Sequence, residues 1–317
     1  MKNPKRKRRI LVGIGLVVLL AGIKIYFEIG NHIYKQQIGQ METQPLQATA
    51  KTLSKDGYDI HYFVSGNPSG ETLIFLHPAF GDHTCFDKQA VFFAQNFQVV
   101  TLDLLGHGLS QAVKTKHKID QSATHLREIM QQEAIGRAHI VGVSMGSLIA
   151  QDFAQQYPDA VLSLTALGGY NINHDNQEIN RAQGKEMFRW LFKVLFSMDA
   201  FRRYTGSVSA ITAEAQAQFF KSAQGFTRKS FPLMSGLGTI IKEREQPLRP
   251  YPLLILAGDH DLDLAKQTAR QWHDEEPESR FLEIEQAGHC ANMDNAEKFN
   301  DVLSEFISNT KKTFPLE

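Results

Sequence analysis

Apolar residues recur along this chain in short runs that alternate with helical stretches. Short apolar runs bounded by turn residues predict strands, whereas apolar residues spaced i, i+3, i+4 and i+7 predict helices. Strands are expected at residues 59–64, 72–77, 98–102, 140–141, 161–167, 253–257 and 280–284. Helices are expected at 119–135, directly after residue 144, at 264–273, and in a last segment carrying Phe299, Val302, Leu303, Phe306 and Ile307. This alternation predicts an α/β domain over residues 51–312, with a mostly parallel sheet flanked by helices.

The alternation stops between about residues 170 and 247, where helical stretches rich in aromatic residues take over. Because this insertion follows the strand at 161–167, we expect it to lie over the carboxyl ends of the strands as a helical cap. Residues 171–247 carry eleven basic and seven acidic side chains. These basic residues lie between the aromatic ones, and such a surface suits solvent or an anionic membrane from which a lipid substrate enters.

The first 50 residues have a different pattern. Residues 1–9 form a basic leader, and residues 10–27 are apolar apart from Lys24. A helix over this run would be about 27 Å long, close to the thickness of a bilayer core. A cleaved signal peptide or a buried core helix would have a similar run, but no small-x-small cleavage site closes it. We therefore expect an uncleaved transmembrane anchor at 10–27, followed by a tether at 28–50 without a core of its own.

Composition and charge indicate a globular protein and argue against a nucleic-acid-binding one. The 317 residues are 42% hydrophobic and 21% charged, which is typical of a globular protein. Six of the 34 basic residues lie in the leader, which leaves 28 basic against 34 acidic residues, a net charge of −6. This balance argues against a nucleic-acid partner. The leader predicts a single-pass protein of the cell membrane with a cytoplasmic N-terminus and an extracytoplasmic catalytic domain.

A serine lies at a sharp turn in the middle of the chain. The strand at 140–141 runs into Gly142-Val143-Ser144-Met145-Gly146, and an amphipathic helix follows. A strand–turn–helix of this kind holds its serine under backbone strain and needs small neighbours. The helix N-terminus points at the position where negative charge would develop during acyl transfer. Ser144 is therefore the expected nucleophile.

An acid and a histidine follow at later strand ends. Ligands of an open parallel sheet bind at the carboxyl ends of the strands, and chain order there gives Ser144, Asp261 and His289. His289 would act as general base and acid, and Asp261 would orient its ring. The backbone N–H groups of Met145 and Ala79 would bind the oxyanion, since Pro78 has no N–H.

Together these motifs resemble the α/β-hydrolase family over about residues 51–310. They are Leu76-His77-Pro78-Ala79-Phe80-Gly81, Asp103-x-x-Gly106-x-Gly108-x-Ser110, the elbow at 142–146, Gly258-Asp259-His260-Asp261 and Gly288-His289. The resemblance implies that the acid is Asp261, ahead of Asp259 and Asp263. The family usually has glycine at the position of Pro78, so Phe80 remains an alternative to Ala79 as oxyanion donor.

The resemblance implies a cofactor-free serine hydrolase that cleaves an ester of a fairly apolar small molecule or lipid. The same triad also serves thioester, C–C bond, acyl-transfer and peptidase chemistry, and a non-catalytic membrane-tethered binding protein is a further alternative. No metal site is expected, because the histidines lack helical ligand spacing and no carboxylates complete a set. His77 is expected to hydrogen-bond neighbouring turns, and Cys85 and Cys290 are expected to be buried thiols, although pairing stays open. The oligomeric state is not indicated.

Overall fold

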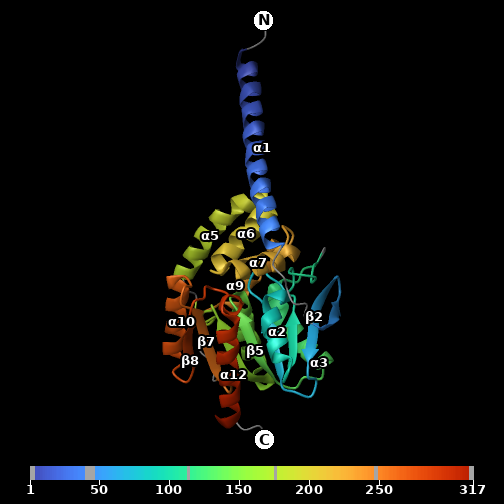
Figure 1. The fold of residues 1–317 in the computed structure, drawn as a ribbon, viewed down its shortest axis with the longest axis vertical. Coiled ribbons are helices and arrows are strands. Elements are labelled where there is room, and N and C mark those ends of the chain that lie inside the picture. Colours follow the sequence, from blue (N-terminus) through green and yellow to red (C-terminus); the bar gives the residue numbers. More distant parts are fainter. Residues whose placement is uncertain (1–3, 40–46, 113–114, 175–176, 246–248, 314–317) are drawn as a thin grey trace.

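A computed structural model describes residues 4–39, 47–112, 115–174, 177–245 and 249–313 (Figure 1). Its centre is an eight-stranded sheet of order β1-β2-β4-β3-β5-β6-β7-β8. β2 pairs antiparallel with β1 and β4, whereas all pairs from β4 to β8 are parallel, so the mostly parallel sheet is confirmed. The strands are β1 (Thr49–Lys55), β2 (Tyr58–Gly66), β3 (Thr72–Leu76), β4 (Gln98–Leu102), β5 (Ala138–Val143), β6 (Val161–Leu167), β7 (Leu253–Gly258) and β8 (Arg280–Ile284).

Helices cover both faces of the sheet. The helices of the sheet domain are α2 (Asp87–Phe93), α3 (Ser122–Gln132), α4 (Met145–Gln156), α10 (Asp263–Glu275), α11 (Ala291–Asp294) and α12 (Ala296–Thr313). Short 3₁₀ turns are η1 (His83–Phe86), η2 (Ile119–Gln121), η3 (Pro158–Ala160) and η4 (Ala223–Gly225). The helices predicted at 119–135, after 144 and at 264–273 correspond to η2 with α3, to α4 and to α10.

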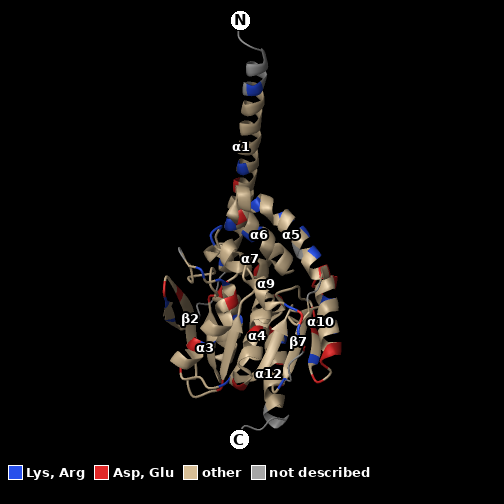
Figure 2. Cartoon of the chain, turned by 180° about the vertical axis from the view of Figure 1, so that it is seen from behind, with Lys and Arg blue, Asp and Glu red and all other residues tan. Residues whose placement is uncertain are grey.

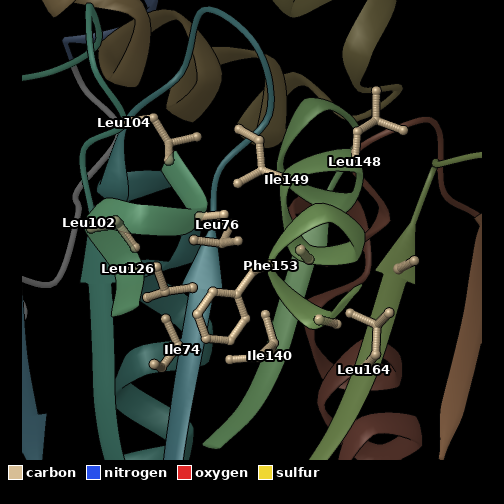
Figure 3. Packing of buried hydrophobic residues seen from close by; sticks show 14 of the residues in the cluster. Ile74, Leu76, Leu102, Leu104, Leu126, Ile140, Leu148, Ile149, Phe153 and Leu164 are labelled. Carbon is tan, nitrogen blue, oxygen red and sulfur yellow. The ribbon is translucent and has the colours of Figure 1, made fainter. Parts of the chain in front are cut away.

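Side-chain alternation along the strands builds a core on each face. Ile74 and Leu76 of β3 pack with Phe153 of α4 on one face (Figure 3). Leu73 and Phe75 point to the other face, which α2 and α12 cover. Successive side chains of a strand point to opposite faces, so one short apolar run contributes to both cores. A strand buried on both faces is the reason why these runs are continuously apolar.

The cap predicted between residues 170 and 247 is a layer of helices at the carboxyl ends of the parallel strands (Figure 1). Its helices are α5 (Gln177–Phe196), α6 (Met198–Ser209), α7 (Ala213–Ser222), α8 (Phe231–Met234) and α9 (Leu237–Ile240). Four of its aromatic side chains pack into a cluster with Phe80 of the sheet domain; the cap members of this aromatic cluster are Trp190, Phe201, Phe226 and Phe231.

The N-terminal helix α1 (Pro4–Ile38) is longer than predicted. Residues 11–38 are long and apolar enough to cross a membrane. The expected tether at 28–50 is wrong for residues 28–38, which continue α1 and contact the cap, and for Thr49 and Ala50, which begin β1. Asn31, Tyr34 and Ile38 recur at helical spacing and contact the cap along one face of α1. Their contact partners lie far away in the sequence, so composition alone suggested a tether. Residues 40–46 lie outside the described residues.

Candidate active site

Ser144 occupies the strained turn between β5 and α4. Its backbone has φ 52° and ψ −118°, a conformation that non-glycine residues rarely adopt. A Cβ atom on Gly142 would collide with the backbone of Gly146, and one on Gly146 would collide with the carbonyl oxygen of Leu76. The turn therefore requires small residues on both sides of Ser144, as the sequence predicted.

His289 and Asp261 come together at the ends of β8 and β7. The two oxygens of Asp261 lie 2.9 and 3.1 Å from Nδ1 of His289. The carboxylate side chain is 1% exposed, and its Oδ1 also accepts a hydrogen bond of 2.7 Å from the N–H of Leu262. Because a carboxylate only accepts, Nδ1 of His289 carries the proton and Nε2 is left as the basic atom of the neutral ring.

The end of β6 lies close to both Ser144 and His289. The N–H of Ser144 donates to the carbonyl of Leu167 over 2.7 Å. The next residue, Gly168, has φ 63°, and a Cβ on it would lie 2.9 Å from Cε1 of His289. The imidazole thus packs against Gly168, the residue after Leu167. The end of β6 is thus in contact both with the turn of Ser144 and with the ring that Asp261 holds.

The surroundings of His289 act on its basicity in opposite directions. Burial lowers the pKa of its imidazole, but the negative charge of Asp261 and the hydrogen bond to it outweigh burial, so the pKa is raised above the ordinary histidine value. A raised pKa makes the ring a stronger proton acceptor.

The other two acids of this turn have different partners. Asp259 accepts hydrogen bonds from the N–H of Ala287 (3.0 Å) and from His260 (2.7 Å). Burial raises the pKa of Asp259, but the hydrogen bonds outweigh burial and lower the pKa to about 2. Asp263 is fully exposed and pairs with Lys266. Of the three carboxylates, Asp261 is the one that contacts His289.

The predicted oxyanion donors lie on two segments that touch. Met145 is the first residue of α4, and the N–H groups of a first helical turn have no acceptor inside the helix. The close approach of Gly146 to Leu76 presses this turn against the end of β3, where the loop with Ala79 and Phe80 begins. Phe80 has a left-handed φ of 73°. The loop and the helix N-terminus thus border one site.

The family described as alpha/beta hydrolase fold matches residues 71–296 of this chain. The chain belongs to the α/β-hydrolase family. It is an enzyme of the hydrolase class.

Several relatives and solved structures are similar to this α/β-hydrolase. An (E)-2-((N-methylformamido)methylene)succinate hydrolase of Acinetobacter baylyi is 24% identical over 264 residues, which cover 79% of this chain and 94% of the relative. A carboxylesterase of Nitrososphaera gargenis has a TM-score of 0.69 at 17% identity and covers 83% of this chain and 100% of its own. A membrane phospholipase A has a TM-score of 0.67 at 19% identity and covers 96% of this chain and 99% of its own. At this identity, the structural likenesses show the fold.

His77 has the structural role that the sequence predicted. Its Nε2 accepts from the N–H of Leu104 (3.0 Å), and its Nδ1 donates to the carbonyl of Pro78 (2.8 Å). Burial lowers the pKa of His77 to about 4, so the ring stays neutral in both bonds. This histidine ties the loop after β3, which carries Ala79 and Phe80, to the segment after β4.

His83 has carboxylate neighbours that the sequence spacing did not reveal. Donor atoms of Asp82, His83 and Asp103 all lie within 4.8 Å of one another, so the expectation that no carboxylates complete a set of possible metal ligands with a histidine was wrong. Asp103 accepts from Nδ1 of His83 (2.7 Å) and from the N–H of Leu109 (2.7 Å). Burial and the nearby charge of Asp103 raise the pKa of Asp82 to about 7. In this structure Asp103 bonds to the side chain and the backbone of His83, while Asp82 accepts from the N–H and the hydroxyl of Thr84, and these bonds fix the loop beneath the site.

Sequence reasoning missed two residues that hold His289 in place. One is Gly168, whose missing side chain makes room for the ring. The other is Asp294, which accepts from the N–H groups of Gly288 (2.9 Å), Ile211 and Thr212 and so ties the histidine loop to the cap. The glycine could have been found from its place directly after a strand; no motif marks the aspartate.

The two cysteines are free and buried, as expected. Sγ of Cys85 donates to Oγ of Ser222 over 3.2 Å. Burial raises the pKa of both thiols, to about 12 for Cys85. Both side chains are therefore held as neutral thiols.

Proposed function

We propose that this α/β-hydrolase is a serine esterase with the triad Ser144, His289 and Asp261, and that it needs no cofactor. The observation that carries the proposal is the contact set around His289. Asp261 accepts from Nδ1 of the ring, and Gly168 leaves space for the ring. Gly168 directly follows Leu167, whose carbonyl accepts from the N–H of Ser144. A base oriented in this way next to a strained serine supports nucleophilic acyl transfer.

The reaction would run in two steps. Nε2 of His289 takes the hydroxyl proton while Oγ of Ser144 attacks the ester carbonyl carbon. The N–H groups of Met145 and of Ala79, with Phe80 as the alternative, bind the oxyanion. Collapse releases the alcohol, which receives the proton from His289. Water then attacks the acyl-enzyme, gives a proton to His289, and Ser144 leaves with that proton as the carboxylic acid departs.

The aromatic cluster supports a substrate with an apolar acyl or alcohol group. Phe80, in the oxyanion loop, lies 5.0 Å between ring centroids from both Phe201 and Phe226 of the cap. His107 packs 5.0 Å from Phe226, and burial lowers its pKa to about 3, so this ring is neutral as well. Uncharged rings beside the oxyanion loop favour hydrocarbon over charged groups.

We also propose that α1 anchors the enzyme in the cell membrane, with its N-terminus in the cytoplasm and the catalytic domain outside. The apolar run of α1 is solvent-exposed in the isolated chain, and a basic leader precedes it. The similarity to a membrane phospholipase A extends over 96% of the chain and so takes in part of α1. This likeness favours a lipid ester among the apolar substrates.

Hydrolysis of p-nitrophenyl butyrate by the wild type and by Ser144→Ala tests the activity. The proposal predicts turnover by the wild type and its loss in the variant; equal turnover by both would refute it. A parallel panel of thioesters and amides separates esterase chemistry from the other reactions of the triad. Extraction of membranes with alkaline carbonate tests the anchor. If α1 crosses the membrane, the full chain stays in the pellet.

A further inference from the structure

The cap helix α5 presents an apolar face that the described chain leaves largely exposed. Its exposed fractions are 75% for Phe188, 42% for Leu191, 46% for Phe192 and 66% for Leu195. These residues recur at i, i+3, i+4 and i+7, which places them on one side of the helix. Large apolar side chains grouped in this way on a surface indicate a contact with another apolar phase or partner.

The apolar face is confined to the half of α5 that lies near α1. Residues 177–186 contain Ile179 and Ala182 as their apolar side chains and are otherwise polar or glycine, whereas most residues from 187 to 196 are apolar. The ring of Phe192 lies 6.1 Å from that of Phe27, the last residue of the apolar run of α1. Figure 1 shows α5 sloping away from α1 toward α10. The polarity of α5 thus changes with distance from the membrane helix.

Contacts between α1 and the cap fix this geometry. Nδ2 of Asn31 donates to Oγ of Ser197 over 2.8 Å in a buried position, and Lys35 forms an ion pair with Asp199. The ring of Tyr34 meets Phe220 edge-on at 5.2 Å. These bonds begin one turn after Phe27. The apolar run of α1 therefore ends beside the apolar half of α5, residues 187–196. The membrane around α1 must therefore reach this part of the cap.

We propose that the apolar face formed by Phe188, Leu191, Phe192 and Leu195 lies in the interface of the bilayer that α1 crosses. The occupant is the phospholipid surface, and the inference rests on the proposed anchor. Basic residues of the same helix support it: Figure 2 shows Lys and Arg along α5, and Arg189, which is 66% exposed and pairs with Glu186, directly follows Phe188, where it would meet lipid phosphates. Continuity with α1 favours the bilayer over a protein partner.

In this position, one side of α5 faces the bilayer and the other side packs against the aromatic cluster. Trp190, on the side opposite Phe188, packs against Phe80 of the oxyanion loop at 6.3 Å between ring centroids. One helix, about 10 Å across, then separates the bilayer from the aromatic cluster next to Ser144. A lipid ester could reach the site by passing this helix, without crossing water. The membrane contact would thus select substrates that partition into the bilayer.

The position of the face is tested with single cysteines labelled by an NBD maleimide in full-length protein reconstituted into phosphatidylcholine–phosphatidylglycerol vesicles. The native thiols are buried with raised pKa values, so introduced cysteines react selectively. The probe sites are Phe188→Cys on α5, Val17→Cys in α1 as the membrane reference, and Phe92→Cys on α2 as an exposed apolar control.

The proposal predicts a blue-shifted emission at positions 17 and 188, with quenching by lipids spin-labelled near the headgroup at position 188, and aqueous emission at position 92. Aqueous emission at 188 with a blue shift at 17 would refute the membrane face and leave the anchor intact. Aqueous emission at both positions would overturn the anchor and the face together.

A second measurement connects the face with catalysis. The triple variant Phe188→Gln, Leu191→Gln, Leu195→Gln changes exposed side chains, and Val91→Gln with Phe92→Gln on α2 is the matched control. With p-nitrophenyl palmitate in the same vesicles, we expect the triple variant to lose at least about tenfold in rate, while the control and the hydrolysis of soluble p-nitrophenyl acetate stay unchanged. An equal loss on the soluble ester, or no loss on vesicles, would refute the proposal.

Discussion

Replacing Gly168 by alanine would place a methyl group against the ring of His289. The residue has φ 63°, so an L side chain there costs about 1–2 kcal/mol of conformational energy. The new Cβ would lie 2.9 Å from Cε1 and 3.0 Å from Nδ1 of His289, where ordinary contacts begin at 3.4 Å. The ring must therefore move by about 0.5 Å, away from its place beside Ser144. Misplacing a catalytic group by about 1 Å costs on the order of a hundredfold in rate.

The expected result for Gly168→Ala is a loss of about ten- to a hundredfold in kcat/KM with p-nitrophenyl butyrate. The melting temperature should fall by about 2–8 °C, since each kcal/mol corresponds to about 2–4 °C in a chain of this size. Gly136→Ala is the matched control, because no heavy atom lies within 4 Å of its Cβ position. If the Gly168 variant kept kcat/KM within twofold of the wild type, the packing of His289 against this residue would have no role in catalysis.

Three further predictions concern the same site and its core. Because His289 must be neutral to accept a proton and its pKa is raised, kcat/KM should rise with pH with a midpoint above 6.5; a midpoint below that value would contradict the raised pKa. Asp261→Asn should lower kcat by about 10⁴-fold, whereas Asp263→Asn at an exposed position should not change it, and equal kcat values in a steady-state assay would exclude Asp261 as the acid. Phe226→Ala should destabilise the fold by about 3–5 kcal/mol in urea unfolding because this buried ring meets three rings of its cluster and the ring of His107, and a loss below about 1 kcal/mol would show that the cluster relaxes around the cavity.

The sequence was most informative where local patterning and burial agree. β3, β4 and β7 appear within a residue of their predicted bounds, because they are buried on both faces and largely apolar. The elbow was visible because strain at Ser144 demands glycine on both sides. The meeting of the strand ends was predictable from the sequence, since a parallel sheet brings them to one edge.

The sequence was least informative where a segment depends on distant partners. β1 lies at the edge of the sheet and pairs with β2 on one side, so it lacks the apolar run of a central strand. Residues 28–38 carry polar side chains such as Asn31, whose partner Ser197 is 166 positions away. The carboxylates around His83 also meet through the fold, because Asp103 lies 20 residues further along the chain.

The central claim is that Ser144 forms the covalent intermediate. The most direct test is to label the reconstituted enzyme with a fluorophosphonate, digest it, and map the adduct by mass spectrometry. The account predicts one modified peptide, with the phosphonate on Ser144, and no adduct in Ser144→Ala. An adduct on another residue of the wild type, or undiminished labelling of the variant, would contradict it.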